Sequence, residues 1–185
     1  MRELSLHILD IIENSRRAEA DLIKIVINEQ PANNLLKIMI EDNGQGIDAQ
    51  KLNSITDPFI TSRTTRDVGL GLALFKAAAE NCGGNLIINS ELNKGTKVEA
   101  EFKYNHIDRA PLGDMTTTIS NFLAANGDQV DIIYNHYFAK KSFEFDSQEV
   151  KSELEDLSIQ SRQIIAWIRE YIEEHLAQIR GGEAF

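Results

Sequence analysis

The stretch EDNGQGI, residues 41–47, constrains the fold of this chain more than any other feature of its sequence. It directly follows an apolar run at residues 35–40, which predicts a strand, and it places Asp42 shortly before Gly44 and Gly46. Glycines let the backbone pass close to a ligand, and a carboxylate accepts hydrogen bonds. The stretch therefore indicates a sharp exit from a strand. A metal loop, a phosphate loop and a plain hairpin turn all fit this local pattern.

The composition indicates a globular protein and argues against several classes of partner. Apolar residues make up 42% of the 185 residues, which is enough for a well-formed core. The formal net charge of −10 argues against nucleic-acid binding and against binding to an anionic membrane, since both need basic surfaces. A single cysteine excludes an intrachain disulfide, and no signal peptide or membrane-spanning run is visible. We expect a soluble cytoplasmic protein.

The charge is unevenly distributed along the chain and indicates two modules. Residues 1–103 carry 12 basic and 15 acidic residues, a net charge of −3, whereas residues 104–185 carry 7 and 14, a net charge of −7. The composition changes at the same place. We therefore predict a first domain at residues 1–104 and a small acidic α+β module at residues 105–185. No motif indicates the role of the second module, which could pack on the first domain or dock onto a partner.

The hydrophobic pattern predicts an α+β sandwich, in which helices cover one face of a mixed β-sheet. A first helix is expected at residues 4–18, with Leu6, Leu9, Ile12 and Glu13 on one side and Ile8 and Ile11 close by. The other elements expected in the first module are strands at 22–28, 35–41, 85–89 and 96–104, helices at 49–55 and 70–81, and a loop at 57–68. In the second module we expect helices at 114–125 and 161–179, a hairpin of 130–138 and 142–145, and a short helix that begins near Asp146.

Two further stretches carry residue types that suit nucleotide chemistry. Asp10 and Asn14 lie four residues apart in the first predicted helix, so both project from the same face. Residues 69–72, Gly-Leu-Gly-Leu, open a later helix, whose N–H groups and positive dipole end suit a phosphate. Each stretch alone is weak evidence, because surface polar pairs and glycine turns are common.

In their order and spacing, the three stretches together resemble the Bergerat, or GHKL, ATP-binding fold of gyrases, heat-shock chaperones, histidine kinases and mismatch-repair ATPases. DIIENSRRAEA resembles the N box of that family and EDNGQGI its G1 box. The segment that contains VGLGLALF resembles the G2 box of a histidine-kinase catalytic domain. The resemblance covers residues 4–103 and implies ATP and Mg²⁺ as ligands.

The resemblance also implies a role for individual residues. Asp42 would accept a hydrogen bond from the adenine amine, with Thr96 supporting it through a water, and Asn14 would ligate Mg²⁺. Residues 57–68 would form a lid over the nucleotide. Further nucleotide contacts are implied for Gly44, Gly46 and Ile47 beside the base and for Arg17, Arg63, Gly69, Leu70, Gly71 and Leu72 beside the phosphates.

Asp10 stands where ATPases and serine kinases of this family usually have a glutamate. Water and serine hydroxyls need a general base, whereas a neutral imidazole is already nucleophilic, so a carboxylate here favours a hydroxyl acceptor or water. Asp10 is one methylene shorter than glutamate, so it would activate a nucleophile weakly or through a water.

The resemblance to a sensor histidine kinase is incomplete. The predicted domain begins close to Met1, without a preceding phosphoacceptor hairpin, and none of the four histidines is followed by an acid. We therefore expect a stand-alone kinase-like regulator that transfers phosphate to, or sequesters, a partner protein. A slow ATPase switch and a non-catalytic ATP-binding module are the alternatives. Phosphate release with and without a partner would distinguish the three.

Overall fold

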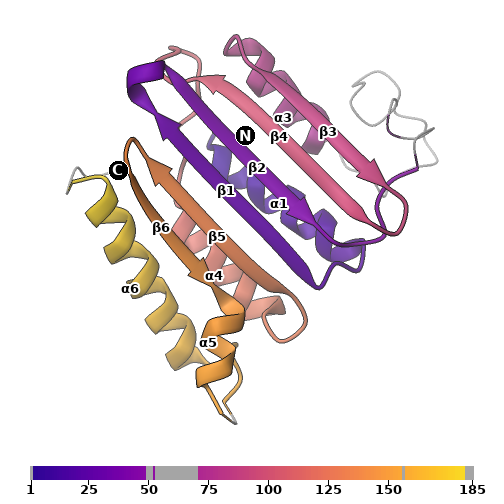
Figure 1. Ribbon diagram of the computed structural model, residues 1–185, viewed down its shortest axis with the longest axis vertical. Coiled ribbons are helices and arrows are strands. Elements are labelled where there is room, and N and C mark those ends of the chain that lie inside the picture. The colour runs from indigo at the N-terminus through magenta and orange to yellow at the C-terminus, as the bar shows by residue number, and fades with distance from the viewer. Residues whose placement is uncertain (1, 49–51, 53–70, 156, 182–185) are drawn as a thin grey trace.

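A six-stranded mixed β-sheet forms the frame of the molecule, as a computed structural model shows for residues 2–48, 52, 71–155 and 157–181 (Figure 1). The strands follow one another across the sheet in the order β3-β4-β2-β1-β5-β6. Their bounds are β1 Leu22–Gln30, β2 Leu35–Asp42, β3 Asn85–Glu91, β4 Gly95–Lys103, β5 Asp131–Phe138 and β6 Lys141–Asp146. Neighbouring strands are antiparallel except β1 and β5, which run parallel.

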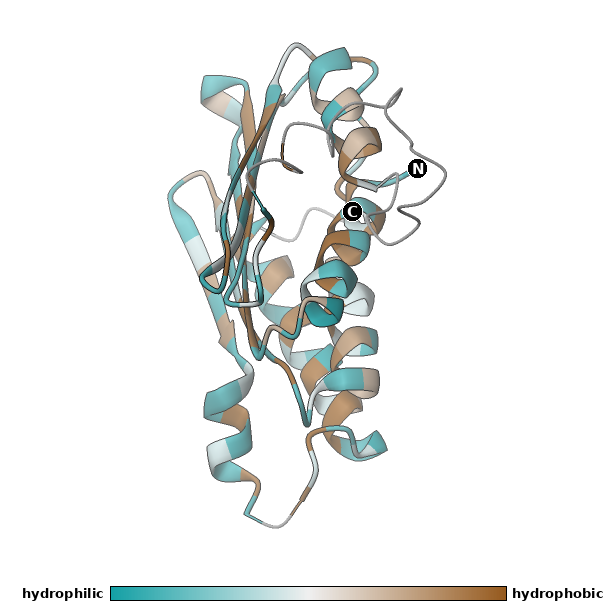
Figure 2. Cartoon of the chain, turned by 90° about the vertical axis from the view of Figure 1, so that its right-hand side faces the viewer, coloured by the Kyte–Doolittle hydropathy of each residue, from teal (hydrophilic) through white to brown (hydrophobic). Residues whose placement is uncertain are grey.

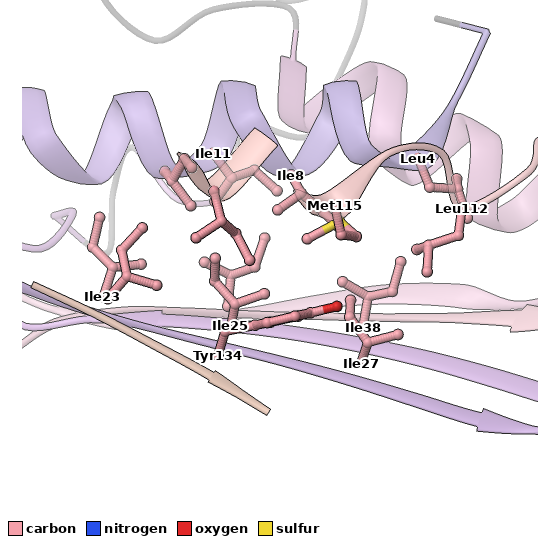
Figure 3. Close-up of a cluster of buried hydrophobic side chains, with 14 of the residues drawn as sticks. Leu4, Ile8, Ile11, Ile23, Ile25, Ile27, Ile38, Leu112, Met115 and Tyr134 are labelled. Atoms are coloured by element: carbon pink, nitrogen blue, oxygen red, sulfur yellow. The ribbon is translucent and has the colours of Figure 1, made fainter. Parts of the chain in front are cut away.

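The longer helices gather on one face of this sheet, while the other face of the strands stays open (Figure 2). The helices are α1 Leu4–Arg17, α3 Gly71–Asn81, α4 Met115–Asn126, α5 Ser147–Glu153 and α6 Arg162–Ile179, with a 3₁₀ turn η1 at Pro31–Asn33. Alternate side chains of each strand point toward the helices, so Ile23, Ile25 and Ile27 of β1 are fully buried. Figure 3 shows them facing Ile8 and Ile11 of α1. The predicted α+β sandwich is confirmed.

The buried face of α1 differs from the one that the sequence predicts. Leu6, expected on the inward side, is 43% exposed, whereas Leu4, Ile8, Ile11 and Ile12 are buried. The reason is that the buried stripe follows the helical spacing of Leu4, Ile8, Ile11 and Ser15, and Leu6 projects from the opposite side of the helix.

The other predicted elements occur within two residues of their expected bounds wherever the structure describes the chain. The helix expected at 49–55, apart from Leu52, and the loop expected at 57–68 lie outside the described residues. The division between residues 1–104 and 105–185 stays a prediction. Because β5 pairs with β1, the second segment extends the sheet of the first. None of the helices within the described ranges is long and apolar enough to cross a membrane.

A buried polar group joins β1, β5 and the end of α6. Glu29 of β1 is 4% exposed, and its Oε1 lies 2.8 Å from Nε2 of His136, whose Nδ1 lies 2.6 Å from the hydroxyl of Tyr134. Arg180 forms an ion pair with the same carboxylate. Burial lowers the pKa of His136 and favours the neutral imidazole. Burial alone would raise the pKa of Glu29, but the hydrogen bond from His136 and the charge of Arg180 outweigh it and lower that pKa.

We predict that the protein loses stability as the pH falls from about 7 to about 5. The ordinary pKa of a histidine is 6.5, so the unfolded chain binds a proton in this range that His136 in the folded protein resists. Stability is therefore present above that pKa and is lost on acidification. The lowered pKa of Glu29 adds a loss of the same sign at lower pH, near the ordinary value of 4.5.

Urea denaturation at several pH values measures this dependence. The variant His136→Gln should show a shallower decrease in unfolding free energy on acidification than the original protein. The unfolding free energy of the variant should still depend on pH to some extent, because burial also lowers the pKa of His7. An equal slope in the variant and the original protein would contradict the assignment to His136.

Candidate functional site

Donors from three parts of the chain hold the carboxylate of Asp42, the last residue of β2. Its Oδ2 accepts a hydrogen bond at 2.6 Å from Oγ of Ser15 in α1. Its Oδ1 accepts from the backbone N–H groups of Gly44 at 3.0 Å and Thr96 at 3.2 Å. Asp42 is 9% exposed, and a carboxylate so buried is costly unless it is hydrogen-bonded. The three donors therefore fix the direction in which Asp42 presents its oxygens.

Asp42 can still accept a further hydrogen bond. A carboxylate offers about four lone-pair sites, and the three donors above use two on Oδ1 and one on Oδ2. The side chain also lines a cavity of about 370 Å³, together with Ser90, Lys94 and Thr96. The remaining lone pair suits an N–H donor of a ligand in this cavity.

Ser90 of β3 connects the turn after β2 to strand β4. Its Oγ accepts from the N–H of Ile47 at 2.8 Å, donates to the carbonyl of Gly95 at 3.0 Å and lies 2.8 Å from Oγ1 of Thr96. Gly46 in the same turn has a φ of +67°, and a Cβ there would lie 2.1 Å from a β3 carbonyl oxygen. The turn therefore requires glycine at this position and closes tightly onto β3.

The helix α1 presents its polar residues beside this turn. Ser15, which binds Asp42, directly follows Asn14, whose Oδ1 lies 3.5 Å from Nη1 of Arg17. One turn earlier is Asp10. A Cβ on Gly71, the first residue of α3, would lie 1.9 Å from the Oδ2 of Asp10, so the start of α3 lies against this carboxylate. A helix start favours a negative charge nearby.

The structure thus brings most of the predicted site residues together. Leu72 is 5% exposed and belongs to the core, so its backbone rather than its side chain is suited to face a ligand. Gly44 packs on the end of α1, where a Cβ would lie 2.6 Å from a carbonyl oxygen. The predicted residues Arg63, Gly69 and Leu70 lie outside the described part of the chain.

Two serines of the site are not among the residues that the sequence motifs indicate. Ser15 is 3% exposed in the last turn of α1, and Ser90 lies near the end of β3. A signal for Ser15 does exist, because serine is unfavourable inside a helix unless its hydroxyl has a partner. For Ser90 the signal is absent, since its partners lie in two other segments that the sequence does not place beside it.

Within the described residues, no group of three or more His, Cys, Asp or Glu side chains is arranged to hold a metal ion. Asn14 offers an amide oxygen, a ligand that suits Mg²⁺. Magnesium sites that use few protein ligands complete their coordination with water and substrate phosphates. A magnesium ion in this site would therefore depend on a phosphorylated ligand.

Comparison with protein families gives a match that spans more than half of the chain. Residues 2–106 match the family model described as "Histidine kinase-, DNA gyrase B-, and HSP90-like ATPase". The matched region contains α1, β1 to β4 and α3, and so includes Asp42 and its three hydrogen-bond donors.

Individual relatives include proteins named as a sensor and as a kinase. The chain is 39% identical over 79 residues to a putative sensor protein of Shewanella frigidimarina, and 33% identical over 91 residues to sporulation kinase D of Bacillus subtilis. These alignments cover 42% and 49% of this chain but 12% and 18% of the relatives. The chain thus spans less than a fifth of their length. The ADP-bound ATPase domain of Aquifex aeolicus MutL gives a TM-score of 0.48 at 15% identity, covering 84% of this chain and 68% of that one.

Proposed function

Because the chain belongs to the family of histidine kinase-, DNA gyrase B- and HSP90-like ATPases, we propose that it binds ATP with Mg²⁺ and acts as a kinase-like regulator of a partner protein. The observation that carries this proposal is the buried carboxylate of Asp42, oriented by three donors and able to accept one more hydrogen bond. The amine of adenine is a donor of the required kind.

The same carboxylate would select adenine over guanine. Adenine carries an amino group where guanine carries a carbonyl oxygen, and a carboxylate cannot donate a hydrogen bond to that oxygen. A guanine in this orientation would place two acceptors against each other in a partly desolvated site. A site built around a hydrogen bond rejects ligands that cannot make it, because the buried group is then left without a partner.

The phosphates would extend from the base toward α1 and the start of α3. Asn14 would hold Mg²⁺ through its amide oxygen, and the ion would neutralise charge on the phosphates. Arg17, which is exposed beside Asn14, would contact phosphate oxygens. The first N–H groups of α3, including those of Gly71 and Leu72, are suited to phosphate oxygens.

Asp10 would act on the nucleophile. Its carboxylate would take the proton of an attacking hydroxyl while the γ-phosphoryl group moves to that oxygen and ADP leaves. The acceptor is then a serine or threonine of a partner protein. A water in the same place would make the protein a slow ATPase. The sensor and kinase names of the relatives favour the partner protein as the acceptor.

We predict that Asp42→Ala weakens ATP binding about ten- to a hundredfold, because a charge-assisted hydrogen bond contributes roughly 1.5–3 kcal/mol. Isothermal titration calorimetry measures this change, and GTP should bind poorly to the original protein. Asp128→Ala is a matched control, because it removes an exposed aspartate that hydrogen-bonds to Ser158 in the C-terminal segment. Equal ATP affinity in Asp42→Ala and the original protein would show that Asp42 does not bind the base.

We predict that Asn14 and Asp10 differ in what their loss changes. Asn14→Ala should weaken binding of ATP in the presence of Mg²⁺ and have less effect without the ion, because it removes a metal ligand. Asp10→Asn should leave binding nearly intact and slow phosphate release by on the order of 10²–10⁴-fold, as expected on loss of a general base.

Both variants are assayed for nucleotide affinity and for phosphate release. Asp10→Glu is an informative companion variant, because the longer side chain restores the length usual in the family's hydroxyl-activating members. It should retain turnover that Asp10→Asn loses. If Asp10→Asn matches the original protein in both measurements, Asp10 is not the base and the nucleotide has a structural role.

A further inference from the structure

A groove far from the ATP site in sequence lies between the C-terminal helices. Its walls are α5, the N-terminal half of α6 and the end of β6, which lie together at one end of the sheet (Figure 1). Its volume is about 520 Å³. The lining is mainly apolar, and the apolar side chains come from all three elements, including Phe145, Val150 and Ile164.

The groove contains one large hydrophobic side chain that is exposed, and it is an aromatic one. Trp167 lines the groove and is 47% exposed. Its ring stacks on that of Tyr171, one helical turn later, with centroids 5.1 Å apart. The ring centroid of Tyr171 in turn lies 4.2 Å from that of His175 and 5.8 Å from that of Phe143. The tryptophan is therefore held in place by ring contacts while much of its surface is in water, as is typical of interface residues.

Acidic side chains surround this apolar lining. Glu144, Asp146, Glu149 and Glu153 all line the groove. Among the residues that the structure describes, no lysine or arginine lines it. The three glutamates form no ion pair with a described residue. Asp146 caps α5 by accepting from the N–H of Gln148. These four acidic residues, here called the acidic rim, therefore present negative charge that a binding partner could neutralise.

We propose that this groove binds a basic amphipathic helix of a partner protein. The apolar lining would receive the apolar face of that helix, and the acidic rim would contact its lysines and arginines. Two helices that form the walls of an apolar groove are a common arrangement for binding a third helix. Trp167 would be the main apolar contact.

Charge decides between this partner and a second copy of the chain. Residues 104–185 carry 7 basic and 14 acidic residues, so two copies of this segment would repel each other across the groove. A positively charged partner helix is attracted by the negative charge of this segment. Its association with the groove should therefore be faster at low ionic strength.

Trp167 is the one tryptophan of the chain, so its fluorescence reports directly on the groove. The probe is a synthetic amphipathic helix of leucine and lysine, about 18 residues long. Its control has glutamate in place of every lysine and the same apolar face. The lysine peptide should shift the Trp167 emission to shorter wavelength and bind more weakly as salt is added. The glutamate peptide should leave the emission unchanged.

A pair of charge-neutral variants tests the acidic rim. Glu149→Gln combined with Glu153→Gln should weaken binding of the lysine peptide about three- to tenfold. The two changes have opposite effects on the α5 dipole, since Glu149 is in the first turn and Glu153 at the end, so the helix should keep its stability. Glu80→Gln combined with Glu101→Gln is the control, because both residues lie in α3 and β4, away from the groove. It should bind as the original protein does.

Trp167→Ala, measured by calorimetry, should weaken binding of the lysine peptide about tenfold or more. Equal binding of the lysine and glutamate peptides would overturn the proposal. So would peptide binding without a change in Trp167 emission, because the peptide would then bind elsewhere. A shift in emission on concentrating the protein alone would identify a second copy as the occupant instead. None of these outcomes depends on ATP binding.

Discussion

The structure around the site depends on one interaction, the hydrogen bonding of a buried carboxylate at the end of β2. The carboxylate of Asp42 can lie in a largely buried position because α1, the turn after β2 and β4 each supply a hydrogen-bond donor. Because each hydrogen bond needs its own direction, the bond from Ser15 to Asp42 fixes the position of α1 relative to the sheet. The same interactions leave the carboxylate able to accept one more hydrogen bond, and Asp42 lines a cavity, which links the packing of the fold to the ligand that it would accept.

The register of the strands fixes the position of Asp42 relative to its donors. Asp42 lies opposite Thr96 in the β2–β4 pair, and Gly95 approaches so closely that a Cβ there would lie 1.8 Å from the Asp42 carbonyl oxygen. A slip of one residue in this register would turn the carboxylate to the open face of the sheet. The site is thus formed on rigid strands and one helix. The C-terminal strands continue this sheet through β5, so the groove lined by Trp167 and the proposed nucleotide site belong to one framework.

Local patterns in the sequence predicted the strands, the helices and their order, because apolar periodicity and turn residues are local signals. The residues Asp10, Asn14 and Asp42 were predicted from family motifs, and the structure places them on neighbouring elements. Non-local contacts could not be predicted. The parallel pairing of β1 with β5 joins segments about a hundred residues apart. The prediction for α1 was wrong at Leu6, because Leu6 lies opposite the buried stripe that Leu4, Ile8 and Ile11 form at helical spacing.

The central claim, that Asp42 recognises adenine, is tested most directly by a crystal structure with a non-hydrolysable ATP analogue and Mg²⁺. The account predicts the adenine amine at about 3 Å from Oδ2 of Asp42, with Ser15, Gly44 and Thr96 still donating to the carboxylate. It also predicts Asn14 on the metal ion. An analogue bound elsewhere, or bound here with its base turned away from Asp42, would contradict the account.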